Sequence, residues 1–166
     1  MSEPQARVEE RYHDLLVRYG GALRRLAAVY FANAADREEL FQEIALALWT
    51  ALPRFRGDAS ERTWLYRVAH NVAITHKARR CRRDREAPLE DLPSNGSGAR
   101  DARLDVQALI RRLPTVDCQI LSLHLDGLSG SEIAEVTGLT QSNVGVRLMR
   151  ARQKLAAMLH GARRDQ

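Results

Sequence analysis

Apolar residues recur at helical spacing along almost the whole chain, and no segment shows convincing strand alternation. Near the start, Tyr12, Leu15, Leu16 and Tyr19 form one apolar stripe, which continues beyond Gly20 to about residue 31. The pair of glycines at 20 and 21 should weaken or kink this helix. The pattern therefore predicts an all-α protein.

Residues 86–103 are rich in Pro, Gly, Ser and acidic residues, and have few large apolar side chains. Such a composition is typical of a flexible linker. The linker divides the chain into a block of residues 1–85 and a block of residues 104–166. Residues 1–85 carry 16 Lys and Arg against 11 Asp and Glu, and residues 106–166 carry 8 against 5. Two basic blocks indicate either two units that bind polyanions or two solvated basic faces.

The second helix is predicted to begin at a capping box formed by Asp36 and Glu39, and to end near Leu52, just before Pro53. Its apolar side packs inward. A different face carries three polar residues and one leucine at positions i, i+3, i+4 and i+7: Glu39, Gln42, Glu43 and Leu46. We interpret this face as a docking surface for a partner protein, the alternative being an ordinary solvated face.

The third helix is predicted to be capped by Ser60 and to run from Arg62 to about Arg83. Trp64 belongs to its apolar side and is expected in the core. Its other residues combine aromatic, amide and cationic groups that suit single-stranded nucleic acid, because rings stack on bases and cations hold phosphates: Tyr66, Arg67, His70, Asn71 and Lys77. We interpret the basic run that includes Arg79 and Arg80 as a phosphate-binding patch, the alternative being a solvated helix end.

The C-terminal block is predicted to contain four helices, at residues 104–113, 116–126, 131–137 and 141–160. Gly127 closes the second, and Ser129 with Glu132 forms a capping box for the third. The short third helix, the turn at Gly138 and the long basic fourth helix fit a helix-turn-helix. Its recognition helix would offer these groups to a DNA groove: Gln141, Ser142, Asn143, Arg147, Arg150 and Lys154. The alternative is an ordinary basic surface helix.

Catalytic and metal-binding patterns are weak in this sequence. His70 and His76 are six residues apart and do not share a helix face, and no Gly-rich phosphate loop is present. Cys81 and Cys118 form no CxxC motif, which argues against a zinc finger or a disulfide framework. We expect no enzyme activity, no cofactor and no metal. No apolar run approaches a membrane span, and the polar N-terminus lacks a signal-peptide core, so we expect no membrane insertion.

Taken together, these motifs resemble the extracytoplasmic-function (group IV) sigma factors of bacterial RNA polymerase. The similarity covers about residues 8–83 and 104–158. Residues 38–49 resemble the polymerase-docking helix of sigma region 2, and residues 55–58 and 63–71 resemble its minus-ten reading segment. Segments at 113–114, 125–129, 132–135 and 144–155 resemble sigma region 4, which reads the minus-thirty-five element.

The resemblance implies a cytoplasmic chain that binds core RNA polymerase, reads promoter DNA as duplex and as single strand, and melts it. It implies an anti-sigma factor as a further partner. Two residues depart from the family pattern. His70 stands where an apolar, small or basic residue is common, and Gly145 stands where Lys or Arg is frequent. The competing hypothesis is a free-standing helix-turn-helix transcriptional regulator.

The linker and the small size of the two blocks predict how the blocks are joined. Each block is near or below the size at which a single core is secure. We therefore expect the two blocks to act as tethered, weak binders rather than as one rigid body.

Overall fold

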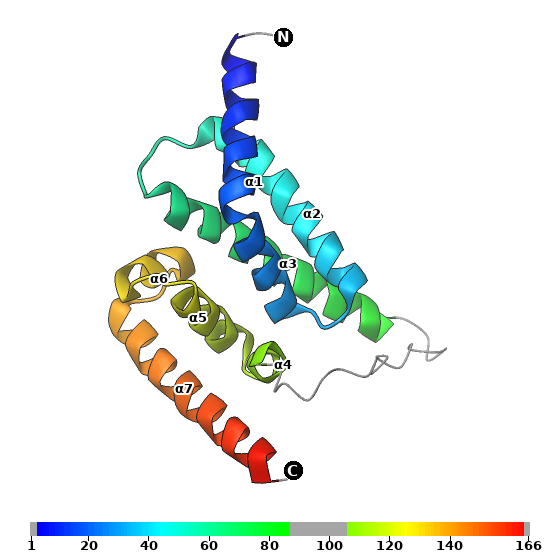
Figure 1. Cartoon of the computed structure of the whole chain (residues 1–166), viewed down its shortest axis with the longest axis vertical. Coiled ribbons are helices and arrows are strands. Elements are labelled where there is room, and N and C mark those ends of the chain that lie inside the picture. Colours follow the sequence, from blue (N-terminus) through cyan, green and yellow to red (C-terminus); the bar gives the residue numbers. More distant parts are fainter. Residues whose placement is uncertain (1–2, 87–105, 165–166) are drawn as a thin grey trace.

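The computed structural model describes residues 3–86 and 106–164, and within these ranges the regular structure is helical throughout (Figure 1). The elements are α1 (Glu3–Tyr30), α2 (Ala34–Ala51), a 3-10 turn (Leu52–Arg54), α3 (Glu61–Glu86), α4 (Val106–Arg111), α5 (Thr115–Leu125), α6 (Gly130–Thr137) and α7 (Gln141–Arg164). The predicted all-α fold is confirmed. The predicted linker, apart from Glu86, and residues 104–105 of the helix predicted at 104–113 lie outside the described residues.

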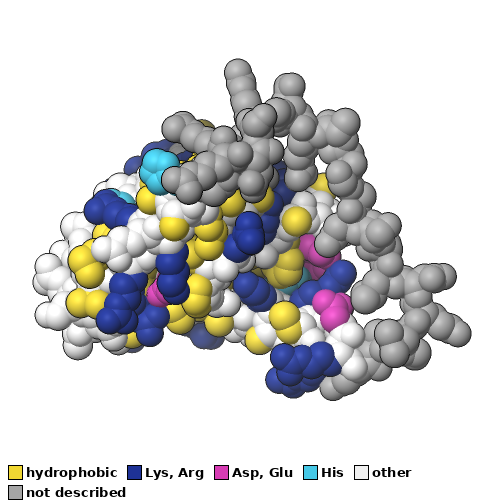
Figure 2. All heavy atoms as spheres, turned by 90° about the horizontal axis from the view of Figure 1, so that it is seen from below, with side chains coloured by type: hydrophobic (Ala, Val, Ile, Leu, Met, Phe, Trp, Pro, Cys, Tyr) yellow, Lys and Arg dark blue, Asp and Glu magenta, His cyan; other side chains and the backbone are white. Residues whose placement is uncertain are grey.

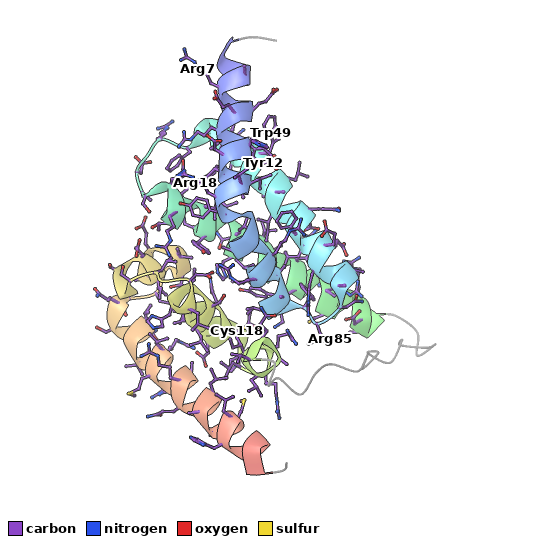
Figure 3. All side chains as sticks on the ribbon, viewed as in Figure 1. Arg7, Tyr12, Arg18, Trp49, Arg85 and Cys118 are labelled. Carbon is purple, nitrogen blue, oxygen red and sulfur yellow. The ribbon has the colours of Figure 1, made fainter. Side chains whose placement is uncertain are left out.

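Helices α1, α2 and α3 pack into an N-terminal bundle (Figure 1). Leu40, Ile44 and Leu48 repeat every four residues on one face of α2, and all three are fully buried. On a neighbouring face, the rings of Tyr12 and Trp49 meet edge to face with centroids 5.1 Å apart (Figure 3). The Tyr12 hydroxyl donates to the carbonyl of Ala45 at 3.0 Å, so this aromatic pair joins α1 to α2.

The helix ends of this bundle confirm one predicted cap and correct another. Ser60 caps α3 as predicted, because its Oγ accepts from the backbone N–H of Thr63 at 3.0 Å. The predicted capping box at Asp36 is wrong, since α2 begins earlier, at Ala34. The side chain of Asn33 accepts from the N–H of Ala35 and caps this helix. Helix α1 runs without interruption through its two glycines.

The C-terminal block has the predicted helix-turn-helix. Ser129 and Glu132 form the reciprocal capping box at the start of α6. Gly127 has a φ of +81°, and Gly138, which ends α6, has a φ of +72°. L-residues with side chains rarely adopt this left-handed conformation, which explains glycine at both turns. Val144 and Ala151 of α7, seven residues apart, are both buried.

The two blocks pack against one another, and this differs from the expectation of two tethered, independent units. One hydrophobic cluster contains Leu65 of α3 together with Leu123 of α5 and Ile133 of α6. A second cluster joins Val29 of α1 to residues of α4, α5 and α7, among them Ile110. Apolar periodicity had indicated which faces are buried, but not that the two blocks cover each other.

Asp126, at the C-terminal end of α5, is the polar centre of this contact. Its carboxylate lies 3.3 Å from Nη2 of Arg25 on α1, and its backbone carbonyl accepts from Arg62 on α3. Burial first, and then the charge and a hydrogen bond of Asp126, raise the pKa of the Tyr66 hydroxyl. Arg111 adds a bond to the carbonyl of Ala28 at 2.7 Å. The contact between the blocks therefore combines two apolar clusters with an ion pair and hydrogen bonds.

His70 is fully buried on α3, and its burial predicts a pH-dependent stability. The Nδ1 atom lies 3.0 Å from the Tyr30 hydroxyl, whereas Nε2 has no hydrogen-bond partner. Burial lowers the pKa of His70 from 6.5 to about 3. Between these values the unfolded chain binds a proton that the folded chain excludes, so stability falls as the pH drops below about 6.5.

When the pH is lowered from 7.5 to 5, we expect the free energy of unfolding to fall by about 2 kcal/mol because of His70. This value follows from the difference between its pKa in the folded and unfolded chain. Urea unfolding of wild type and His70→Gln at both pH values measures this difference. Other titrating groups affect both proteins alike, so the wild type should lose more stability than the variant. Equal losses would show that His70 is not held neutral.

Candidate nucleic-acid and partner interfaces

The predicted docking face of α2 lies on the surface of the N-terminal bundle. Leu46 is 65% exposed, which is unusual for a leucine in a helix whose other large aliphatic residues are buried. Gln42 and Glu39 are also exposed, and Glu43 is half-buried. The four residues thus form one accessible stripe with a single large apolar side chain. The structure places them together, as the helical spacing predicted.

The acids of this stripe pair with the basic end of α3. Glu43 accepts from Arg79 at 2.7 Å and lies 3.1 Å from Nδ1 of His76. Arg80 lies 3.2 Å from Asp36, and Arg83 lies 4.0 Å from Glu39. The sequence did not reveal these pairs, because the partners are about forty residues apart. Arg79 and Arg80, predicted to hold phosphate, are therefore engaged with α2, although exposed pairs of this kind contribute at most about 1 kcal/mol each.

The middle of α3 presents only some of the predicted nucleic-acid contacts. Tyr66 and His70 are 2% and 0% exposed. Tyr66 faces the contact with Asp126 and His70 packs near Tyr30, so neither is available to a base in this structure. Asn71 is exposed, and Arg67 and Lys77 are partly exposed. Trp64 belongs to the core, as predicted.

One group among the described residues has donor atoms close enough for a metal ion. Glu39, Glu43 and His76 each place one such atom within 4.8 Å of the others. The charge of Glu43 is already compensated by Arg79, and the inner nitrogen of His76 has no partner to orient it as a ligand. These features fit an ion-pair cluster between α2 and α3 better than a metal site.

The first turns of α7 carry the predicted duplex-reading groups on the surface. Arg147 is the half-buried member, and the others are exposed: Gln141, Ser142, Asn143, Arg150 and Lys154. Nη1 of Arg147 donates to Asp117 of α5 at 2.9 Å, which the sequence did not suggest. Gly145 is exposed, and a side chain there would meet no atom within 4 Å. Packing therefore does not explain why glycine stands here in place of the more frequent Lys or Arg.

Basic side chains form several groups on one face of the molecule. Figure 2 shows lysine and arginine side chains in separate groups on the face seen from below, interleaved with hydrophobic side chains. Such interleaving suits binding to polyanions and to partner proteins alike. Within the described residues, no helix is both long and apolar enough to cross a membrane.

Each half of the chain matches a known protein-family model. The family model described as Sigma-70 region 2 matches residues 15–83, and the one described as Sigma-70, region 4 matches residues 103–155. Together with the helix-turn-helix and the three-helix bundle, these matches define a protein built from sigma regions 2 and 4.

Individual sigma factors that are similar to this chain show which kind of sigma factor it is. The chain is 30% identical to the RNA polymerase sigma factor CnrH of Cupriavidus metallidurans, over 91% of this chain and 87% of that protein. It is 28% identical to the ECF RNA polymerase sigma-E factor of Escherichia coli, over 89% of this chain and 85% of that protein. The solved structure of the sigma factor RpoE from Bartonella quintana superposes with a TM-score of 0.74 at 20% identity, covering 91% and 98% of the two chains. The chain belongs to the ECF family and is an RNA polymerase sigma factor.

Proposed function

We propose that this sigma factor binds core RNA polymerase through α2 and reads promoter DNA through α3 and α7. Residues 1–85 act as the minus-ten and docking unit, and residues 104–166 act as the minus-thirty-five unit. The observation that carries the proposal is the exposed stripe of α2. In this stripe a 65% exposed leucine lies beside polar side chains, within the residues matched to Sigma-70 region 2, which supports a surface for a protein partner.

The docking stripe consists of Glu39, Gln42, Glu43 and Leu46. Leu46 supplies the apolar contact, and Gln42 is free of the ion pairs that occupy the acids. Glu39 and Glu43 can exchange their arginine partners for groups of the polymerase, because those arginines are more than half exposed. Binding at this stripe would then release Arg79 for phosphate contact, together with its neighbour Arg80 once that residue leaves Asp36.

The minus-ten surface is proposed to consist of Arg67, Asn71 and Lys77. Arg67 and Asn71 are four residues apart and share one face of α3. The Asn71 amide can hydrogen-bond to an unstacked base, while the two cations hold the backbone. Tyr66 and His70 are left out of this surface because both are buried.

Replacing Asn71 with Ala should change base preference at one position of the minus-ten element. Holding an extruded base requires a few kcal/mol of compensating contacts, and the amide supplies part of them. The measurement is transcription by the polymerase holoenzyme from a library randomised over that element. Gln153→Ala is the matched control, because it removes an exposed carboxamide from α7, outside the proposed minus-ten surface. Identical preferences for Asn71→Ala and wild type would contradict the assignment.

The minus-thirty-five surface is proposed to be the first turns of α7, with Gln141, Ser142, Asn143, Arg147, Arg150 and Lys154 facing or flanking the major groove. Asn and Gln can contact base edges, and Arg150 and Lys154 can contact phosphates. This role requires the first turn to be exposed, and Gln141, Ser142 and Asn143 are all exposed.

We also propose an anti-sigma factor as a partner, since the related RpoE was solved with the anti-sigma factor NepR. The chain would work in the cytoplasm beside the polymerase, and would have no catalytic activity of its own. Footprinting of a promoter with core polymerase, with the chain, and with both tests the proposal. Protection of both elements only with both proteins is expected. Specific protection by the chain alone would favour the free-standing regulator.

A further inference from the structure

Three polar side chains form a hydrogen-bonded chain between α5 and the first turn of α7. Asp117 of α5 has a side chain only 9% exposed, and its Oδ1 accepts from Nη1 of Arg147 at 2.9 Å. The same guanidinium uses Nε to donate to Oδ1 of Asn143 at 3.1 Å. Asn143 is exposed on α7. A nearly buried carboxylate is thereby connected to a surface amide.

The hydrogen bonds that join Asp117, Arg147 and Asn143 determine which way the Asn143 amide faces. A guanidinium has donors only, so the carboxamide atom beside Nε must be the oxygen. The NH₂ group of Asn143 then points away from Arg147. The backbone N–H of Asn143 is also held, by Oγ1 of Thr140 at 3.3 Å. Both the backbone and the side chain of Asn143 are therefore oriented before any DNA arrives.

We propose that Asp117 is a positioning residue for reading the minus-thirty-five element. Through Arg147 it keeps the Asn143 NH₂ group directed outward, where a base edge would lie. Arg147 is accordingly a bridge between the two residues rather than a base contact. The inference rests on the proposed function, because it requires α7 to face the major groove.

The orientation of the amide has a consequence for the base that Asn143 prefers. A free asparagine pairs with adenine through its oxygen and its NH₂ group together. Here the contact with Arg147 turns the oxygen toward the guanidinium, so the NH₂ donors are the part of the amide directed outward to the groove. Guanine presents two acceptors in the major groove, whereas cytosine presents a donor. The structure therefore assigns Asn143 to a position where guanine is preferred and cytosine is disfavoured.

Asn143→Asp tests this assignment directly. The carboxylate still accepts from Arg147, but it offers the groove an acceptor in place of the NH₂ donor. Transcription by holoenzyme from a library randomised over the minus-thirty-five element should show the preference at one position reversed from guanine to cytosine. The ratio of the two bases should change roughly tenfold. An unchanged ratio at every position would overturn the proposal.

Asp117→Ala tests the positioning role in the same library. Without the carboxylate, Arg147 is released and Asn143 can rotate, so discrimination for guanine over adenine should be lost at that position alone. Glu135→Ala, which removes an exposed carboxylate from α6, is the matched control for charge. An equal loss of transcription from all sequences would show that Asp117 is only structural. If Asp117→Ala does not fold, Arg147→Lys replaces it, because an ammonium cannot reproduce the two-sided bridge.

The outcomes separate this inference from the proposed function. If wild-type holoenzyme shows no base preference anywhere in the minus-thirty-five element, the assignment of α7 to that element is wrong. If preferences exist but neither Asn143→Asp nor release of Arg147 alters them, α7 reads DNA and only the positioning role of Asp117 is wrong.

Discussion

Leu46→Glu should weaken binding to core RNA polymerase by roughly 30- to 1000-fold. Truncating or charging a central apolar contact in a protein interface costs about 2–4 kcal/mol, which corresponds to that range. Leu46 is the single large apolar side chain of the docking stripe and is 65% exposed. Glutamate has nearly the same helix propensity as leucine, so α2 itself should remain folded. A fluorescence titration of labelled chain with core polymerase measures the change.

Val17→Glu is the matched control for this experiment. Val17 is 68% exposed on α1, so the two variants introduce the same charge at sites of similar exposure on different helices. Gln42→Ala is a second probe of the stripe, and it leaves the ion pairs of Glu43 intact. Equal affinities for Leu46→Glu and Val17→Glu would show that α2 does not carry the docking surface.

Ile133→Ala should destabilise both halves of the protein, by about 2–5 kcal/mol for removal of a fully buried isoleucine side chain. Ile133 lies on α6 and is 0% exposed. It belongs to the same cluster as Leu65 of α3, although the two residues lie in different sigma regions. Hydrogen exchange should therefore become faster in α3 as well as in α6. Urea unfolding gives the total loss of stability.

The reciprocal variant makes this test stricter. Leu65→Ala on α3 should accelerate exchange in α6, since the cluster is shared. Val146→Ala on α7 is the control, because Val146 is 44% exposed and its truncation should change stability by no more than about 0.5 kcal/mol. Faster exchange confined to the mutated half, in both variants, would mean that the blocks fold as independent units.

Local signals in the sequence predicted the helices well because those signals are short-range. The capping box of Ser129 and Glu132 and the turn at Gly138 involve residues within a few positions of each other, and both are present. The start of α2 was misplaced for a related reason. Asp36 and Glu39 have the spacing of a capping box, but Asn33 can cap the same helix one turn earlier.

The exposure of the candidate site could not be predicted in the same way, since it depends on contacts that are distant in sequence. The side chain of His70 could contact a base, but it is buried in the core, where its Nδ1 lies within hydrogen-bond distance of the Tyr30 hydroxyl, forty residues away in the sequence. Arg79 was expected at phosphate, and it pairs with Glu43 of α2. Periodicity gave no sign that Asp126 would join the two blocks. The face that a helix buries is encoded locally, whereas its partner depends on the whole fold.

Run-off transcription with purified core polymerase is the most direct test of the central claim, that this chain directs promoter-specific initiation. A library of promoter fragments is transcribed by core alone, by core with the wild-type chain, and by core with Leu46→Glu. Specific transcripts that require the wild-type chain and are lost with Leu46→Glu are the predicted result. The same transcripts from core alone, or none with the wild-type chain while that chain binds specific duplex DNA by itself, would contradict it.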